Sequence, residues 1–284
     1  MYECFTVDIT DHIAHVVMNR PDKRNSMTVA FWDELPAIIE DIDDGAKARV
    51  IVLSSTGPHF TSGIDVSLFG PDNDLLEPES DNAFSERQDG ARFYDTVRRL
   101  QHSFSAIENC RLPVLVAIQG GCIGGGVDLV TACDMRYATE DAFLTIFETN
   151  IGMTADVGTF PRLVKLIPEG IVRELAYTGR RMPAAEAQAT GLVNRVFPDH
   201  ASLVAGVMEI AAEIARKAPL AVYGCKRIIN YARDHTTADG LDYIGIWNAS
   251  MLQLDEIREA MAAGQEQRAG RFAELPPRRR RADR

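Results

Sequence analysis

Cysteine and histidine are scarce in this sequence of 284 residues, which contains five cysteines and six histidines. The cysteines are odd in number and form no CxxC pair, which argues against a disulfide framework and is typical of reduced core thiols in a cytoplasmic protein. The histidines form neither an HxH nor an HxxxH cluster, so the sequence gives no support for a metal site. We therefore expect no metal and no separate cofactor.

Long apolar runs and net positive charge are also lacking. No run reaches the ~18 residues that a membrane-spanning helix needs, and the N-terminus does not resemble a secretory signal, so we expect a cytoplasmic protein with no membrane partner. The formal charge of −11, from 30 basic and 41 acidic side chains, argues against nucleic acid as a partner. With 46% hydrophobic and 25% charged residues, the chain has the composition of a globular protein with ample core.

The sequence does contain a concentrated glycine run, GGCIGGG at residues 120–126. It follows an apolar strand pattern at 114–118 and precedes apolar residues at helical spacing. A helix that begins there would direct its unpaired N–H groups and positive dipole end at a phosphate, a carboxylate or an enolate oxygen. A glycine run can equally serve as a tight turn with no ligand, and the residues alone leave both interpretations open.

Three acidic residues follow the glycine run. Asp128 lies in an apolar setting, Glu148 follows a strand-like segment, and Asp156 lies in a glycine-containing loop. Carboxylates packed together in an apolar cleft would raise one another's proton affinity and act as acids and bases near neutral pH. The alternative is that Asp128 makes a local cap or ion pair while Glu148 and Asp156 are solvated.

The periodicity along the chain predicts alternating strands and helices, and hence an α/β fold with parallel strands and helical crossovers. Pro36, inside the first helix, is expected to kink or shorten it. Residues 70–89 are rich in Pro, Asp, Asn, Glu and Ser, which indicates a mobile or weakly ordered insertion. The expected strands are 5–9, 13–18, 50–53 and 192–197, and the expected helices are 28–44, 92–107, 201–217, 220–233 and 238–262.

The segment from Ile118 to Glu148 resembles the signature of the crotonase (enoyl-CoA hydratase/isomerase) superfamily. Two other blocks agree with it, RPDKRNSM at 20–27 and FTSGID at 60–65. Membership implies a ββα spiral core over 1–198, a C-terminal helical oligomerisation segment over 199–265, and a homotrimer or a hexamer made of two trimers. The last residues, 266–284, end in PPRRRRADR and are expected from composition to form a basic, disordered tail.

The resemblance also implies an acyl-CoA thioester as partner, with coenzyme A entering as part of the substrate. The backbone N–H groups of Ile64 and Gly125 would form an oxyanion hole for the thioester oxygen. Lys23 and Arg24 would lie beside the adenine and phosphates, although two adjacent cations also suit a solvated turn. Lys226 matches a position where the family often has a phosphate-binding lysine, and a surface lysine is the alternative. The other implied substrate contacts are Ser62, Gly63, Asp65 and Gly126.

Within the superfamily, the trio Asp128, Glu148 and Asp156 resembles that of the dienoyl-CoA isomerases, which convert 3,5-dienoyl-CoA to 2,4-dienoyl-CoA. Hydratases carry glutamates at the first two positions, whereas this chain has an aspartate at the first. The expected roles are Glu148 as the base at C2, Asp156 as the acid at C6, and Asp128 as the residue that tunes the pair. Two alternatives stay open: an enoyl-CoA hydratase, and a non-catalytic protein of the same fold that binds acyl-CoA or RNA.

Overall fold

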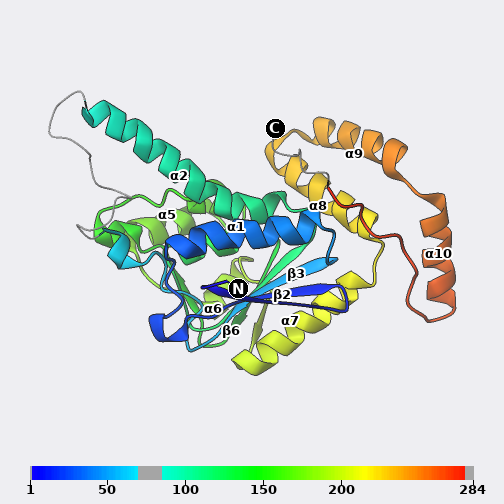
Figure 1. Cartoon of the computed structure of the whole chain (residues 1–284), viewed down its shortest axis with the longest axis horizontal. Coiled ribbons are helices and arrows are strands. Elements are labelled where there is room, and N and C mark those ends of the chain that lie inside the picture. The colour runs from blue at the N-terminus through cyan, green and yellow to red at the C-terminus, as the bar shows by residue number, and fades with distance from the viewer. Residues whose placement is uncertain (1, 70–84, 279–284) are drawn as a thin grey trace.

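A six-stranded sheet forms the centre of the molecule (Figure 1). The computed structural model describes residues 2–69 and 85–278. The strand order is β1-β2-β3-β4-β6-β9, with β1 antiparallel to β2 and the other pairs parallel. The strands are β1 (Phe5–Thr10), β2 (Ile13–Met18), β3 (Val50–Ser55), β4 (Val114–Ile118), β6 (Met135–Thr139) and β9 (Arg195–Phe197). This mainly parallel sheet confirms the predicted α/β class.

Helices cover both faces of this sheet, which explains why β3 is buried along its whole length. Val50 contributes to the core on one face and Ile51 to the core on the other, as the alternation of side chains in a strand requires. One face is covered by α1 (Val29–Asp44) and α2 (Ser85–Asn109), and the other by α7 (His200–Ala215) (Figure 1). Because α7 packs on the strands, the hydrophobic core continues past residue 198, which is the predicted end of the spiral core.

The helix that Pro36 was expected to kink or shorten runs unbroken for 16 residues. Proline has no N–H, so the carbonyl four residues earlier, that of Trp32, loses its helical hydrogen bond. The buried Ser103 hydroxyl of α2 donates to this carbonyl at 2.8 Å. α2 therefore supplies the hydrogen bond that Pro36 removes.

A second sheet, with strand order β5-β7-β8, carries the glycine run. β5 ends at Ile123 and α3 begins at Gly125, so the predicted order of strand, glycines and helix is confirmed. The elements here are β5 (Gly121–Ile123), α3 (Gly125–Ala132), β7 (Phe143–Thr145), the 3₁₀ helix η3 (Glu148–Ile151), α4 (Thr159–Leu163), α5 (Glu169–Thr178), β8 (Met182–Pro183) and α6 (Ala184–Ala189). Two further 3₁₀ helices are η1 (Pro21–Lys23) and η2 (Val66–Phe69).

The second long helix begins earlier than its apolar spacing predicted. α2 starts at Ser85 rather than at residue 92, so residues 85–89 are helical and not part of a weakly ordered insertion. The rest of the predicted insertion, residues 70–84, lies outside the described residues. The N-terminal half of α2 projects beyond the sheet (Figure 1). Its sequence has few apolar residues at helical spacing, which is why the predicted helix began only at residue 92.

Three helices, α8 (Pro219–Asp234), α9 (Thr237–Met251) and α10 (Leu254–Gln265), form one end of the molecule (Figure 1). After α10 the chain returns to the core, where the side chain of Leu275 is buried. Arg111 donates to the Pro276 carbonyl at 2.8 Å, and the Arg278 N–H donates to the Asp44 carbonyl at 2.8 Å. The expected disordered tail is therefore wrong for residues 266–278, while residues 279–284 lie outside the described part of the chain.

Candidate active site

Two segments far apart in the sequence lie side by side at the edge of β5. Thr61 forms a parallel bridge with Cys122 and exchanges backbone hydrogen bonds of 3.1 Å with Gly121 and Ile123. The Thr61 hydroxyl accepts from the Gly63 N–H at 3.1 Å and donates to the Asn25 carbonyl at 2.7 Å. The predicted oxyanion loop, residues 62–64, is thereby fixed against the glycine turn that opens α3.

The backbone N–H groups of Ile64 and Gly125 are free to bind a ligand. Across residues 2–69 and 85–278, neither N–H makes a hydrogen bond to the protein. Gly63 has φ +83°, and a Cβ there would lie 2.6 Å from the Ile123 carbonyl oxygen and 3.4 Å from the Gly125 nitrogen. Only glycine allows this approach, which brings the two unpaired amides together.

Both amides face a cavity of about 640 Å³. Its wall is mainly apolar, so charge that develops on a bound thioester oxygen would be met by amide dipoles with little competition from water. Ser62 and Gly63 also line it, as expected. The lining residues are Ser62, Gly63, Ile64, Val66, Ile123, Gly124, Gly125, Phe147, Glu148, Ile151 and Met153.

Glu148 is the acidic residue that lines this cavity, at the start of η3. Burial, together with repulsion from Asp128 and Asp156, raises its pKa to about 7. Its Oε1 atom lies against Gly124, where a Cβ would stand 3.2 Å away. Its buried Oε2 atom has no hydrogen-bond partner among the described residues. A carboxylate with a pKa near neutrality and an unused oxygen is suited to proton transfer.

Asp128 lies behind the cavity on α3, with a side chain that is 1% exposed. Its Oδ1 atom accepts a hydrogen bond of 2.6 Å from the Thr159 N–H. Burial raises its pKa to about 6, against the lowering effect of the bonds to Thr159. The carboxylate does not line the cavity and influences Glu148 through its charge.

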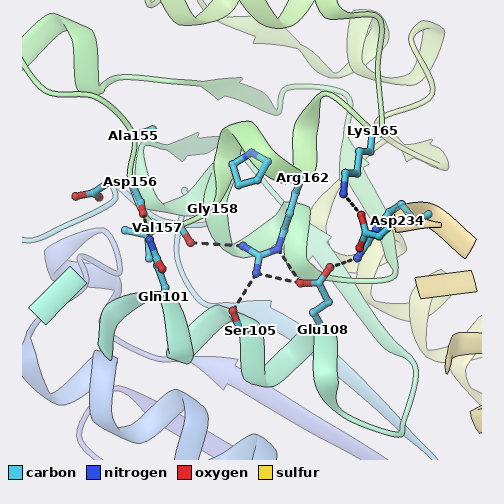
Figure 2. Close-up of a pocket in the computed structure, with 12 residues that line it drawn as sticks. Gln101, Ser105, Glu108, Ala155, Asp156, Val157, Gly158, Arg162, Lys165 and Asp234 are labelled. Carbon is cyan, nitrogen blue, oxygen red and sulfur yellow. Dashed lines mark hydrogen bonds and ion pairs between the residues drawn. The ribbon is translucent and has the colours of Figure 1, made fainter. Parts of the chain in front are cut away.

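Asp156 lies on the loop between η3 and α4 and is half-buried. Burial raises its pKa above the usual range. It does not line the large cavity, and its carboxylate is turned away from Arg162 and from the smaller pocket that its backbone helps to form (Figure 2). Asp156 raises the pKa of both Asp128 and Glu148, and Asp128 raises that of Glu148, but of these three acids only Glu148 lines the cavity.

The predicted coenzyme A contacts, Lys23 and Arg24, lie on an exposed turn next to the oxyanion loop. Arg24 has φ +52°, and its carbonyl accepts from the Ser62 N–H at 2.9 Å. Neither side chain lines the cavity. Both cations therefore lie outside the cavity, on a turn bonded to the loop that lines it.

Two of the predicted substrate contacts have other places in the structure. The Asp65 carboxylate accepts hydrogen bonds from the Ser26 hydroxyl at 2.7 Å and from the Ser67 N–H and hydroxyl, which lowers its pKa. Gly126 is buried, and a Cβ there would lie 2.5 Å from the Thr61 Cγ2 atom. Asp65 therefore shapes the loop, and Gly126 lets α3 pack closely against it.

Lys226 is neither a surface lysine nor placed to bind phosphate. It is 7% exposed and donates to the carbonyls of Ile107 and Leu112 at 3.0 and 2.8 Å. It also forms an ion pair with Asp134 at 2.8 Å. These three partners satisfy all the donors of the ammonium group, so Lys226 holds α8 to the core.

The apolar wall was missed in the sequence. Phe147 directly precedes η3 and Ile151 ends it, and their large apolar side chains among polar neighbours could have identified them. The side chains that hold the loop of Asp156 were also missed, because Gln101 and Arg162 come from other elements. Such contacts depend on tertiary packing, which no local spacing records.

Two other kinds of feature are absent from the described ranges. There, no group of three or more His, Cys, Asp and Glu side chains could hold a metal ion. None of the helices described is long and apolar enough to span a membrane.

The chain is similar in sequence and in structure to known proteins. The mitochondrial Delta(3,5)-Delta(2,4)-dienoyl-CoA isomerase of Rattus norvegicus is 45% identical over 262 residues, which cover 90% of this chain and 77% of the relative. The crystal structure of an enoyl-CoA hydratase from Bacillus anthracis is 30% identical and superposes with a TM-score of 0.81, covering 95% of this chain and 99% of that one.

A third protein, from Thermobifida fusca, was solved in complex with acetoacetyl-CoA. It is 26% identical, with a TM-score of 0.77, and the match covers 88% of this chain and 94% of that one. The family model for enoyl-CoA hydratase/isomerase matches residues 8–275. The chain therefore belongs to the enoyl-CoA hydratase/isomerase (crotonase) family.

Proposed function

We propose that this protein is a dienoyl-CoA isomerase that converts 3,5-dienoyl-CoA to 2,4-dienoyl-CoA. One observation carries the proposal: Glu148 and the unpaired N–H groups of Ile64 and Gly125 line the same apolar cavity. The identity with the rat isomerase over 90% of this chain supports the same reaction. The acyl-CoA substrate is further supported by the complex of the Thermobifida fusca protein with acetoacetyl-CoA.

The reaction needs a base, an acid and a site for negative charge. Glu148 removes a proton from C2, and the electron pair of that C–H bond moves towards the thioester oxygen. The N–H groups of Ile64 and Gly125 stabilise the resulting dienolate, and the loss of one such donor typically costs ~10²–10³ in rate. Asp156 then delivers a proton to C6, so that the double bonds shift to C2 and C4 and the thioester carbonyl reforms.

The proton balance over one turnover needs one proton held between Glu148 and Asp156. Mutual repulsion among buried carboxylates favours such sharing, because ionising the second group next to the first is costly. The raised pKa values of Glu148, Asp128 and Asp156 support this sharing. Asp128, at the greatest depth, holds the loop of Asp156 and tunes Glu148 by its charge.

Coenzyme A is proposed to approach along the turn of Lys23 and Arg24, where positive charge would offset its phosphates. This turn shares a backbone hydrogen bond with the oxyanion loop. Adjoining segments would therefore bind the coenzyme phosphates and the thioester of the substrate. The acidic charge of −11 weakens the alternative of an RNA-binding protein.

An enoyl-CoA hydratase is the second candidate, favoured by the likeness to the Bacillus anthracis hydratase. That chemistry requires a water held between the carboxylates of Asp128 and Glu148. Asp128 does not line the cavity, and one of its oxygens is used by the Thr159 N–H. Asp156, the proposed acid of the isomerase, does not line the cavity either, so the 45% identity to the rat isomerase supports the isomerase over the hydratase.

We also propose a homotrimer or hexamer, because α9 and α10 expose more apolar surface than isolated helices usually leave uncovered. The exposed residues are Leu241, Ile244, Ile246, Met251, Leu252, Leu254, Ile257 and Met261. A cytoplasmic location, expected from the sequence, stays a prediction, and the rat relative is mitochondrial by name.

The test compares two variants on two substrates. Asp156→Asn keeps the shape of the side chain but cannot deliver a proton, and we expect it to lower turnover of 3,5-dienoyl-CoA by ~10² or more. Glu148→Gln should be at least as damaging on either substrate. Formation of the conjugated dienoyl thioester is followed by its absorption, and hydration of 2-enoyl-CoA by loss of the enoyl absorption.

The outcomes separate the candidates. A wild-type protein that hydrates 2-enoyl-CoA rapidly, and whose rate is unchanged in Asp156→Asn, is a hydratase. Full isomerisation by Asp156→Asn would show that this carboxylate does not deliver the proton. Binding of the substrate should change little in either variant, because the acyl-CoA is held mainly by its coenzyme portion and the oxyanion hole.

A further inference from the structure

The loop that carries Asp156 is held from outside by a polar stripe on α2. Gln101, Ser105 and Glu108 follow the spacing i, i+4, i+7, which places them on one face of the helix. Figure 2 shows Gln101 directed towards the loop, and Ser105 and Glu108 directed towards Arg162, which follows the loop in α4. Each of these three residues is half-buried.

Gln101 makes the one contact of this stripe with Asp156 itself. Its Nε2 atom donates to the Asp156 backbone carbonyl at 2.7 Å, and its Oε1 atom accepts from Arg98 at 2.8 Å. Arg98 can only donate and a carbonyl can only accept, so these partners fix the orientation of the amide. Both polar atoms of the Gln101 amide are therefore held by hydrogen bonds. Through its Nε2 atom, Gln101 fixes the peptide unit that follows Asp156.

The rest of the stripe fixes the neighbouring residue. Arg162 donates to the Val157 carbonyl at 3.4 Å, and is itself held by Glu108 at 3.1 Å and by the Ser105 hydroxyl at 3.2 Å. On the inner side, Asp128 accepts from the Thr159 N–H. The loop is therefore anchored beyond Asp156 from both sides, whereas at Asp156 itself the bond from Gln101 is the one that the described part of α2 supplies.

We propose that Gln101 is a positioning residue for Asp156, holding its main chain so that its carboxylate reaches the far end of the dienoyl chain. The inference rests on the proposed function, because it requires Asp156 to act as the acid at C6. Gln101 lies outside the large cavity and does not touch the substrate. It acts on the second proton transfer and leaves the first, at C2, to Glu148.

The experiment separates these two transfers in Gln101→Met, which keeps the length of the side chain and removes the amide. In D₂O, exchange at C2 of unconverted 3,5-dienoyl-CoA reports removal and return of the C2 proton, and product formation reports delivery at C6. We expect isomerisation to fall by about tenfold to a hundredfold, the scale of a small misplacement of a catalytic group. The C2 exchange rate should stay within about twofold of wild type, and KM should be unchanged.

Two further variants make the result specific. Gln188→Met changes an exposed glutamine on α6 and should match wild type in both readouts. Arg98→Met removes the outer partner of Gln101, and should lower isomerisation in the same selective manner but by less. Urea denaturation of all three variants checks that the fold is intact.

The outcomes are distinguishable. Unchanged isomerisation in Gln101→Met, or a parallel fall of C2 exchange and isomerisation, overturns the positioning role while leaving the proposed function in place. A wild-type protein that exchanges C2 but forms no 2,4-dienoyl product overturns the proposed function, and this inference with it.

Discussion

The buried carboxylate of Asp128 accepts a hydrogen bond of 2.6 Å from the backbone N–H of Thr159. Thr159 begins α4 directly after the loop that carries Asp156, so this bond ties the deepest acid to the loop of another. The charge of Asp128 also raises the pKa of Glu148. A residue that does not line the cavity thereby influences both proposed proton-transfer groups.

The first prediction concerns pH dependence. Asp128→Asn keeps an oxygen for the Thr159 N–H but removes the charge, so the pKa of Glu148 should fall from about 7. Glu148 acts as a carboxylate, and kcat/KM is therefore lost as pH falls through that pKa. The acidic limb of the pH profile should move to lower pH by about one unit. Asp141→Asn, which changes an exposed carboxylate, is the control and should leave the limb in place.

The second prediction concerns the cost of the raised pKa for stability. The folded pKa of Glu148 is about 7, above its ordinary value of 4.5, so ionising it destabilises the fold as pH rises between these values. Glu148→Gln should raise the free energy of unfolding by about 1–3 kcal/mol at pH 8 and change it little at pH 4. Urea denaturation at both pH values measures this, and an equal effect at the two would contradict it.

The alternation of strands and helices could be predicted from the sequence because its signals are local, whereas the proposed oxyanion hole was indicated by the family resemblance of residues 60–65 and 118–148. Apolar runs and alternation predicted the strands, and Gly63 stands where only glycine fits. The unbroken course of α1 could not be predicted, because the hydroxyl that satisfies the Trp32 carbonyl comes from Ser103, 71 residues away.

The sequence was least informative where polar residues are buried by tertiary contacts. Lys226 has the pattern of a surface residue and is buried by its bonds to Asp134, Ile107 and Leu112. Residues 266–278 are polar enough to suggest disorder, yet the ion pair of Arg49 with Glu274 and the burial of Leu275 hold them in place. Composition measures average burial and carries no information about a specific partner.

The third prediction tests whether the Ser103 hydroxyl replaces the helical hydrogen bond that Pro36 removes. Ser103→Ala removes the hydroxyl that donates to the Trp32 carbonyl, and leaves a buried acceptor unsatisfied. We expect the free energy of unfolding to fall by about 1–3 kcal/mol. Ser250→Ala, which removes an exposed hydroxyl bonded to the Ile246 carbonyl within its own helix, should cost much less. Similar losses of unfolding free energy in the two variants would show that the Ser103 hydroxyl does not compensate for Pro36.

The fourth prediction concerns assembly. Light scattering at micromolar concentration should give the mass of three or six copies of the 31.3 kDa chain. Leu241 and Ile246 are 66% and 57% exposed on α9, and replacing both with Glu should shift the protein towards the monomer by placing charge in an apolar contact. A wild-type protein that runs as a monomer would rule out the proposed trimer and hexamer.

The last prediction concerns the oxyanion hole. Gly63→Ala places a methyl group 2.6 Å from the Ile123 carbonyl oxygen, at a residue whose φ of +83° already disfavours a side chain. The loop must move away from the glycine turn, which separates the N–H of Ile64 from that of Gly125. We expect turnover of 3,5-dienoyl-CoA to fall by ~10²–10³, the cost of losing one such donor.

The matched control is Gly191→Ala. Gly191 has φ +85°, so alanine meets the same backbone strain, but no atom lies within 4 Å of the added Cβ. It should lose some stability and keep its turnover. A crystal complex with a bound acyl-CoA should place both N–H groups of the wild type within ~3 Å of the thioester oxygen. Equal turnover in the two variants, or a thioester oxygen bound elsewhere, would show that Ile64 and Gly125 do not form the oxyanion hole.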